Sequence, residues 1–208
     1  METWAALFER AEAFGVDEAG VRSTLATRRE GTRAGDDAET GDRGDDPSRS
    51  PPSGDPSPAR VVADADVLAA DLLTDGDARD ALDGLRAHSW TTLVASDPLL
   101  DDAEAVIAEL ADPALAADWR ERVEAWRELV AQPSGDHPAL ASAFRGGAMH
   151  VLSFDDRLTA PGAGAGLNDR FPVSVREPRA FAALFDAEKL YPEVAEGEYP
   201  GPDREPRA

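Results

Sequence analysis

Arg60-Val-Val-Ala-Asp-Ala-Asp-Val-Leu68 is the stretch on which the predicted fold depends. Its short apolar run is typical of a buried strand, and the run stops at two carboxylates, Asp64 and Asp66. Apolar residues at helical spacing then continue from Val67 to Leu73. Open α/β sheets present functional groups on buried strands that deliver an acid at the carboxyl end, so this stretch predicts both a fold and a site.

The chain from residue 60 to residue 188 repeats this alternation of apolar runs and helical patterns, which is typical of a parallel sheet with crossover helices. Strands are predicted at 60–64, 90–95, 149–153 and 171–175. Helices are predicted from residue 67 and over 77–87, 97–110, 113–130, 137–146 and 177–185. We therefore expect an α/β fold with three layers, α/β/α, around a central and mainly parallel sheet.

Three segments outside that region have different patterns. Residues 1–29 carry an apolar stripe at three- and four-residue spacing and a break near Gly15, which predicts an N-terminal helical hairpin. This hairpin could dock on the main domain or bind a protein partner. Residues 30–59 are rich in Gly, Asp, Ser and Pro, so we expect a disordered linker. Residues 189–208 are rich in Pro, Glu and Gly and are predicted to form a loose tail.

The composition is strongly acidic. Forty-two acidic residues face 21 basic ones, the net charge is −21, and Lys189 is the single lysine. Abundant Asp and Ala with almost no Lys resemble the proteins of salt-loving archaea. Long-range repulsion is screened in molar salt, where the Debye length is about 3 Å, so the negative charge does not exclude a nucleic-acid substrate. The absence of cysteine excludes disulfides and thiol nucleophiles. No apolar run reaches membrane-spanning length, and we expect a cytoplasmic protein without a membrane partner.

Four acidic residues are predicted to converge at one edge of the sheet. Asp64 ends the first strand, Asp102 lies in the helix after the second, Asp136 begins a helix, and Asp155 follows the third strand. Carboxyl ends of parallel strands and the following helix starts share one edge. Crowded carboxylates repel unless cations neutralise them, and their oxygens suit Mg²⁺ or Mn²⁺. The pattern predicts a metal site there. The alternatives are strand-end capping for Asp64 and Asp155, helix capping for Asp136 and a solvated helix face for Asp102.

The order of these segments resembles a PIN domain, the nuclease fold of metal-dependent ribonucleases. The resemblance covers residues 60–186. It is carried by Val61-Val-Ala-Asp-Ala-Asp-Val-Leu68, Ser96-Asp-Pro-Leu-Leu-Asp-Asp102, Asp136-His-Pro-Ala-Leu-Ala-Ser-Ala-Phe144, Val151-Leu-Ser-Phe-Asp-Asp-Arg-Leu158 and Phe171-Pro-Val-Ser-Val175.

The resemblance implies a Mg²⁺- or Mn²⁺-dependent ribonuclease that acts on single-stranded RNA. The metal ligands and catalytic acids would be Asp64, Asp102, Asp136 and Asp155, and Ser153 stands at the family's small hydroxyl position. Asp102 replaces the family's usual glutamate, so Asp101 or Glu104 could take its place.

Other functions stay open. The same fold could bind RNA or a protein without catalysis, with the acids explained by the overall composition. A toxin of a toxin–antitoxin pair and a homodimer are further alternatives. Arg22, Arg28 and Arg29 could contact nucleic acid, although acidic residues stand beside them.

Overall fold

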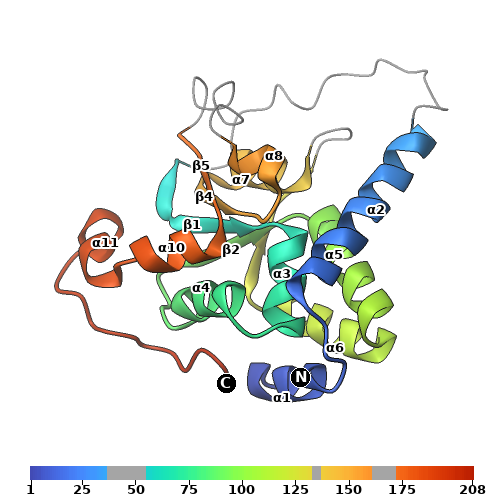
Figure 1. The fold of residues 1–208 in the computed structure, drawn as a ribbon. Helices are drawn as coiled ribbons and strands as arrows, with labels where there is room; N and C mark the ends of the chain where they lie inside the picture. The colour runs from blue at the N-terminus through green and yellow to red at the C-terminus, as the bar shows by residue number, and fades with distance from the viewer. Residues whose placement is uncertain (37–54, 133–136, 161–171) are drawn as a thin grey trace.

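The computed structural model describes residues 1–36, 55–132, 137–160 and 172–208. Within these residues, five strands form one parallel sheet in the order β3-β2-β1-β4-β5 (Figure 1). The strands are β1 (Ser57–Ala63), β2 (Thr92–Ala95), β3 (Arg127–Leu129), β4 (Ala148–Leu152) and β5 (Ser174–Arg176). The predicted α/β fold with a central parallel sheet is confirmed, and β1 lies at its centre.

Helices on both faces of the sheet complete the three layers. From β1 the chain steps outward to β2 and β3 through α3 (Ala65–Leu73), α4 (Asp77–Arg86), α5 (Asp97–Leu110) and α6 (Pro113–Glu124). It then returns across the sheet to β4 through α7 (Pro138–Gly146). Right-handed crossovers in opposite directions place their helices on opposite faces, and α7 accordingly packs on β1, β2 and β4. The remaining helices are α8 (Asp156–Thr159), α10 (Pro178–Leu184), which packs on α4, and α11 (Ala187–Val194).

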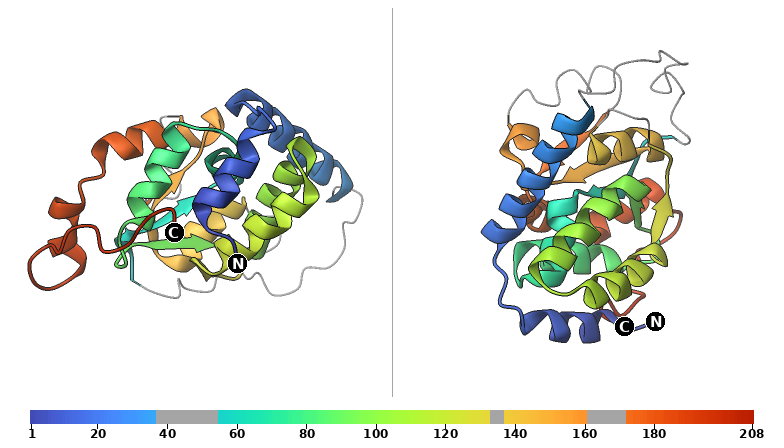
Figure 2. Two further views of the ribbon diagram at one scale, coloured as in Figure 1. Left: turned by 90° about the horizontal axis from the view of Figure 1, so that it is seen from below. Right: turned by 90° about the vertical axis from the view of Figure 1, so that its right-hand side faces the viewer.

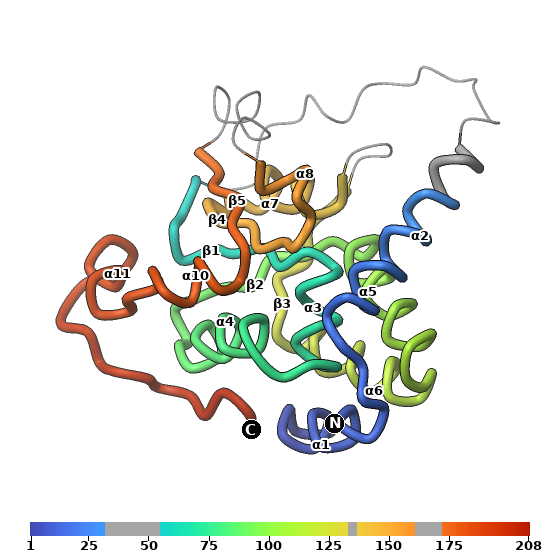
Figure 3. The backbone as a smooth tube through the Cα atoms, viewed as in Figure 1, coloured from blue at the N-terminus to red at the C-terminus, as the bar shows by residue number. Residues whose placement is uncertain are grey.

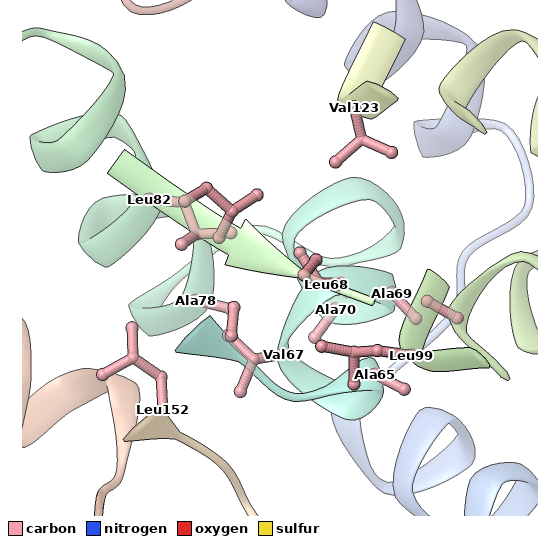
Figure 4. Close-up of a cluster of buried hydrophobic side chains, with 14 of the residues drawn as sticks. Ala65, Val67, Leu68, Ala69, Ala70, Ala78, Leu82, Leu99, Val123 and Leu152 are labelled. Atoms are coloured by element: carbon pink, nitrogen blue, oxygen red, sulfur yellow. The ribbon is translucent and has the colours of Figure 1, made fainter. Parts of the chain in front are cut away.

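Helix α3 is the centre of the hydrophobic core. All nine of its residues are buried, because α1, α2, α4, α5 and the sheet surround it. Figure 4 shows its side chains, among them Leu68 and Ala69, between residues of neighbouring elements such as Leu82 and Leu99. The burial explains why this segment is almost entirely apolar, and it also places two acidic residues, Asp66 and Asp71, inside the protein.

The two predicted N-terminal helices are α1 (Trp4–Glu12) and α2 (Glu18–Asp36), and they pack on the main domain, which was one of the two expected possibilities. Helix α1 contacts α3 and α6, and α2 lies across α3 and α5 (Figure 3). Helix α2 extends to Asp36, so residues 30–36 of the expected linker are helical. The last residues of that expected linker, from Ser57 onward, belong to strand β1. Residues 37–54 lie outside the described part of the chain. No helix in the described ranges is long and apolar enough to cross a membrane.

The C-terminal segment packs against the protein instead of forming the expected loose tail. Asp203 accepts a hydrogen bond from the backbone of Ser89 at 2.7 Å, and Arg207 forms an ion pair with Asp83 at 2.7 Å. The backbone N–H of Ala5 donates to the carbonyl of Arg207 at 3.0 Å, which places the segment beside α1 (Figure 2). The expectation failed because the polar residues of this segment find specific partners.

One predicted helix is shorter than expected and is followed by a strand. The helix expected over 113–130 ends at Glu124, and residues 127–129 form β3, which pairs with β2 at the edge of the sheet. Three residues are too few to show an alternating pattern, whereas apolar residues at helical spacing from Leu115 to Val130 favour one continuous helix. Trp119 of α6 is fully buried in the core.

Candidate acidic site at the carboxyl edge of the sheet

Asp64 lies at the junction of β1 and α3. Its backbone N–H donates to the carbonyl of Leu152 on β4 at 2.8 Å, continuing the strand pairing by one residue. Its carboxylate is the N-cap of α3 and accepts from the N–H of Ala65 at 2.8 Å. The side chain has no exposed surface. The strand end and the helix start therefore fix this carboxylate at the carboxyl edge of the sheet, as predicted.

Ser153 brings the end of β4 to the same carboxylate. Its hydroxyl lies 3.1 Å from Oδ2 of Asp64 and 3.4 Å from Oδ2 of Asp66, and it accepts from the N–H of Asp155 at 3.0 Å. Asp66 also accepts from the N–H of Phe154 at 3.0 Å. Asp66 thus connects the start of α3 with the residues that follow β4, and its role is structural.

Arg29 on α2 also lies in the site, where it was not predicted from the sequence. Its Nη2 donates to Oδ1 of Asp64 at 2.7 Å, and its Nη1 donates to Oδ2 at 3.2 Å. Nη1 also lies 3.1 Å from Nε2 of His137, which is 3.9 Å from Asp64. Only 10% of the Arg29 side chain is exposed. A buried guanidinium therefore neutralises the buried carboxylate.

Asp102 reaches the same guanidinium from α5. The Nε of Arg29 donates to its Oδ2 at 3.3 Å, and the Nε of Arg28 donates to its Oδ1 at 3.2 Å. Asp64, at the end of β1, and Asp102, in the second turn of α5, thus contact the same guanidinium, and Asp102 also pairs with Arg28. The predicted convergence of these two acids is present, with a guanidinium between them.

The ionisation of the site follows from this arrangement. Burial alone would raise the pKa of Asp64, but the charge and hydrogen bonds of Arg29 outweigh burial and hold that pKa below its usual range. Burial raises the pKa of Asp66 well above its usual range, and the neighbouring Asp64 carboxylate adds to the effect. Burial also opposes the charge on Arg29, but Asp64 and Asp102 raise the pKa of Arg29.

Asp155 lines a cavity next to these groups. It is the N-cap of α8, and its hydrogen bonds from Arg157 hold its pKa below the usual range. A cavity of about 380 Å³ separates α2 from the chain after β4. Its lining includes the predicted acid Asp155 together with Asp66 and three arginines, Arg22, Arg29 and Arg157.

The expected cluster of four carboxylates around one metal ion is not formed by the described residues. Asp136 falls among residues 133–136, which lie outside the described part of the chain. Among residues 1–36, 55–132, 137–160 and 172–208, no three His, Asp or Glu side chains are grouped so that they could hold a metal ion. Asp64 and Asp102 nevertheless supply the hard oxygen donors that Mg²⁺ prefers, and a cationic group lies between them.

The sequence contains little that could have identified Arg29. The residue stands 35 positions before Asp64, on a helix outside the predicted main domain, and no spacing rule connects the two. The one available signal was a pair of adjacent arginines, Arg28 and Arg29, in a strongly acidic chain.

Comparison with known proteins identifies the sequence family of the chain. No curated protein and no solved structure matches the chain. A sequence family without an assigned function matches residues 55–207, which include Asp64, Asp102, Ser153 and Asp155 but exclude α1 and α2. The chain therefore belongs to this family, described as the family of unknown function DUF7384.

Proposed function

We propose that the protein is a PIN-like, Mg²⁺- or Mn²⁺-dependent ribonuclease whose site is built on Asp64, Asp102, Asp155 and Ser153. The observation that carries the proposal is the meeting of Asp64 and Ser153, 3.1 Å apart at the ends of neighbouring parallel strands β1 and β4. The strand order β3-β2-β1-β4-β5 places that meeting point at the centre of the sheet edge, where open α/β sheets bind ligands.

Each residue would have a distinct role. Asp64 and Asp102 would hold the metal ion, since they already share a cation through Arg29. When bound, the ion would supply an activated water and stabilise charge on the phosphoryl oxygens. Ser153 would orient the carboxylate of Asp64 through its hydroxyl. Asp155, held ionised by Arg157, would orient a water molecule on the cavity side.

The cavity beside the acids supports RNA as the substrate class. Arg22 and Arg157 line it in a chain of net charge −21, and guanidinium groups bind phosphate oxygens through two parallel hydrogen bonds. In molar salt, the repulsion between RNA and the remaining acids is screened over a few ångströms. A phosphodiester in the cavity would lie next to Asp66 and Asp155.

An assay with labelled single-stranded RNA in molar KCl and Mn²⁺ tests the proposal. Cleavage should be lost when Asp64→Asn is combined with Asp155→Asn. The matched control replaces two exposed carboxylates far along the helices, Glu109→Gln with Glu121→Gln, and should keep full activity. Cleavage that persists in the Asp64→Asn/Asp155→Asn protein would refute the proposed site.

A second candidate function is a PIN-like module that binds RNA or a protein without cleaving. The specific observation in its favour is the bidentate pairing of Arg29 with Asp64, because a guanidinium in that position leaves no room for a metal ion. A protein that binds single-stranded RNA in molar KCl, but neither binds Mn²⁺ nor cleaves in any variant, would support this alternative. The homodimer and a protein partner of the N-terminal helices stay predictions.

A further inference from the structure

We propose that the C-terminal part of α2, from Arg28 onward, is a gate that closes the acidic site with the guanidinium of Arg29 and opens when a divalent cation takes its place. This inference rests on the proposed function, because it concerns regulation of the same site. The gate would keep the enzyme inactive until this part of α2 withdraws.

The contacts of Arg29 exclude a metal ion from the same carboxylates. The guanidinium uses both oxygens of Asp64, at 2.7 and 3.2 Å, and Oδ2 of Asp102, at 3.3 Å. A divalent ion bound to Asp64 and Asp102 would need these oxygens and would also lie in contact with a buried positive charge. Because like charges at such distances repel strongly, occupancy by Arg29 and occupancy by a metal ion are mutually exclusive.

Loss of the guanidinium without a replacement is also disfavoured. Asp64 is fully buried, and a buried carboxylate without a partner is strongly destabilising. The site is therefore a two-state exchange, in which one cation leaves only as another arrives. A hard divalent ion suits that exchange because the vacated ligands are carboxylate oxygens.

Burial differs between the first half of α2 and its C-terminal end. Val21 and Leu25 are buried in the core and fasten the first half of the helix. After Arg29 the helix is exposed at Glu30 and Gly31, and a Cβ at Gly31 would meet no atom within 4 Å. Glycine also weakens a helix, so this end can separate while Val21 and Leu25 stay in place.

The gate is an element outside the matched family region. The family match begins at residue 55, so it includes Asp64, Asp102 and Asp155 but not Arg29. The acids Asp64 and Asp102 and the guanidinium of Arg29 therefore belong to different parts of the chain. The contact between them depends on the docking of α2 on α3 and α5.

Binding of Mn²⁺, followed by the electron paramagnetic resonance of the free ion in molar KCl, tests the gate without an activity readout. Arg29→Ala should bind Mn²⁺ at least tenfold more tightly than the unsubstituted protein. Arg10→Ala is the matched control, because Arg10 lies on α1 and pairs with Glu2 and Asp118 outside the cavity; its affinity should stay unchanged. Arg29→Ala combined with Asp64→Asn should lose the tight binding while removing both buried charges together.

Two results would overturn the gate. One is equal Mn²⁺ affinity in the Arg29→Ala and unsubstituted proteins, and the other is tight binding that survives Asp64→Asn in the Arg29→Ala protein. The proposed gate and the proposed ribonuclease activity can be refuted independently. Tight Mn²⁺ binding by Arg29→Ala without RNA cleavage would retain the gate and refute the enzyme. Equal cleavage by the unsubstituted and Arg29→Ala proteins would do the reverse.

Hydrogen exchange on the unsubstituted protein gives a test that does not depend on whether Arg29→Ala folds. At saturating Mg²⁺, amide exchange should accelerate in residues 28–31 and stay slow in residues 21–25, which include Val21 and Leu25. Unchanged or slower exchange in residues 28–31 with Mg²⁺ bound would overturn the proposal.

Discussion

Asp71, in the last turn of α3, forms a buried ion pair with Arg86, and the two side chains are only 1% and 3% exposed. Nη1 and Nη2 of Arg86 donate to the two carboxylate oxygens of Asp71, and the guanidinium lies 4.0 Å from the ring centre of Trp4. The pair thereby connects α3, α4 and the N-terminal helix α1.

Removing one partner of this pair should be costly. Arg86→Met leaves Asp71 buried without its cation, and such changes typically cost about 3–5 kcal/mol in the free energy of unfolding. Combining Asp71→Leu with Arg86→Met should restore most of that loss, since no charge then stays buried. Denaturant unfolding in molar KCl measures both, and a loss below about 1 kcal/mol for Arg86→Met would contradict the expected role.

Gly146 should not tolerate alanine, because α7 packs too closely on β2. A Cβ at this position would lie 2.3 Å from Cγ1 of Val94, which forces the helix away from the sheet. Such overpacking typically costs about 1–3 kcal/mol. Thermal unfolding is the measurement, and Gly146→Ala in a Val94→Ala background should cost clearly less than in the unsubstituted protein. Equal costs in the two backgrounds would show that the close contact is not responsible.

His150 should make stability fall in acid. Burial lowers its pKa below 6.5, and the positive charge of Arg176 adds to the effect. Between the folded-state pKa and 6.5 the unfolded chain binds more protons, so the free energy of unfolding decreases as pH falls through that window. Denaturant unfolding at pH 7.5 and pH 5.5 should show a smaller difference for His150→Phe, which keeps an aromatic ring beside Phe181. An unchanged pH dependence would exclude His150 as its source.

Ser153→Ala should weaken the site more than the fold. The hydroxyl lies 3.1 Å from Asp64 and accepts from the N–H of Asp155, so its loss frees the orientation of one acid and leaves one backbone donor without its partner. Loss of a buried hydrogen-bonding group typically costs about 1–3 kcal/mol. In the Arg29→Ala protein, Mn²⁺ affinity should fall several-fold on adding Ser153→Ala. Unchanged affinity would limit Ser153 to a structural role.

The local sequence determines the parts of the fold that were predicted correctly. The apolar run before Asp64 specifies a strand, the acid begins a helix, and the parallel pairing of β1 and β4 then brings Ser153 to Asp64. A short strand such as β3 carries no periodic signal, and its residues follow a helix without a strong break.

Contacts between distant segments account for the rest. Arg29 reaches Asp64 because α2 docks across α3 and α5, and Asp203 reaches Ser89 because the C-terminal segment folds back. Neither contact follows from spacing, since each depends on where a whole segment packs. Asp136, the third of the four expected acids, lies outside the described residues.

The separation of these contacts along the chain also sets an order of events during synthesis. Arg29 and Asp64 are 35 residues apart, whereas Ser153 follows Asp64 by 89 residues. A growing chain therefore contains the acid and its guanidinium partner long before it contains the strand that completes the site. The counter-ion of Asp64 is thus encoded in the same chain, so burial of this carboxylate in the folded structure needs no metal ion.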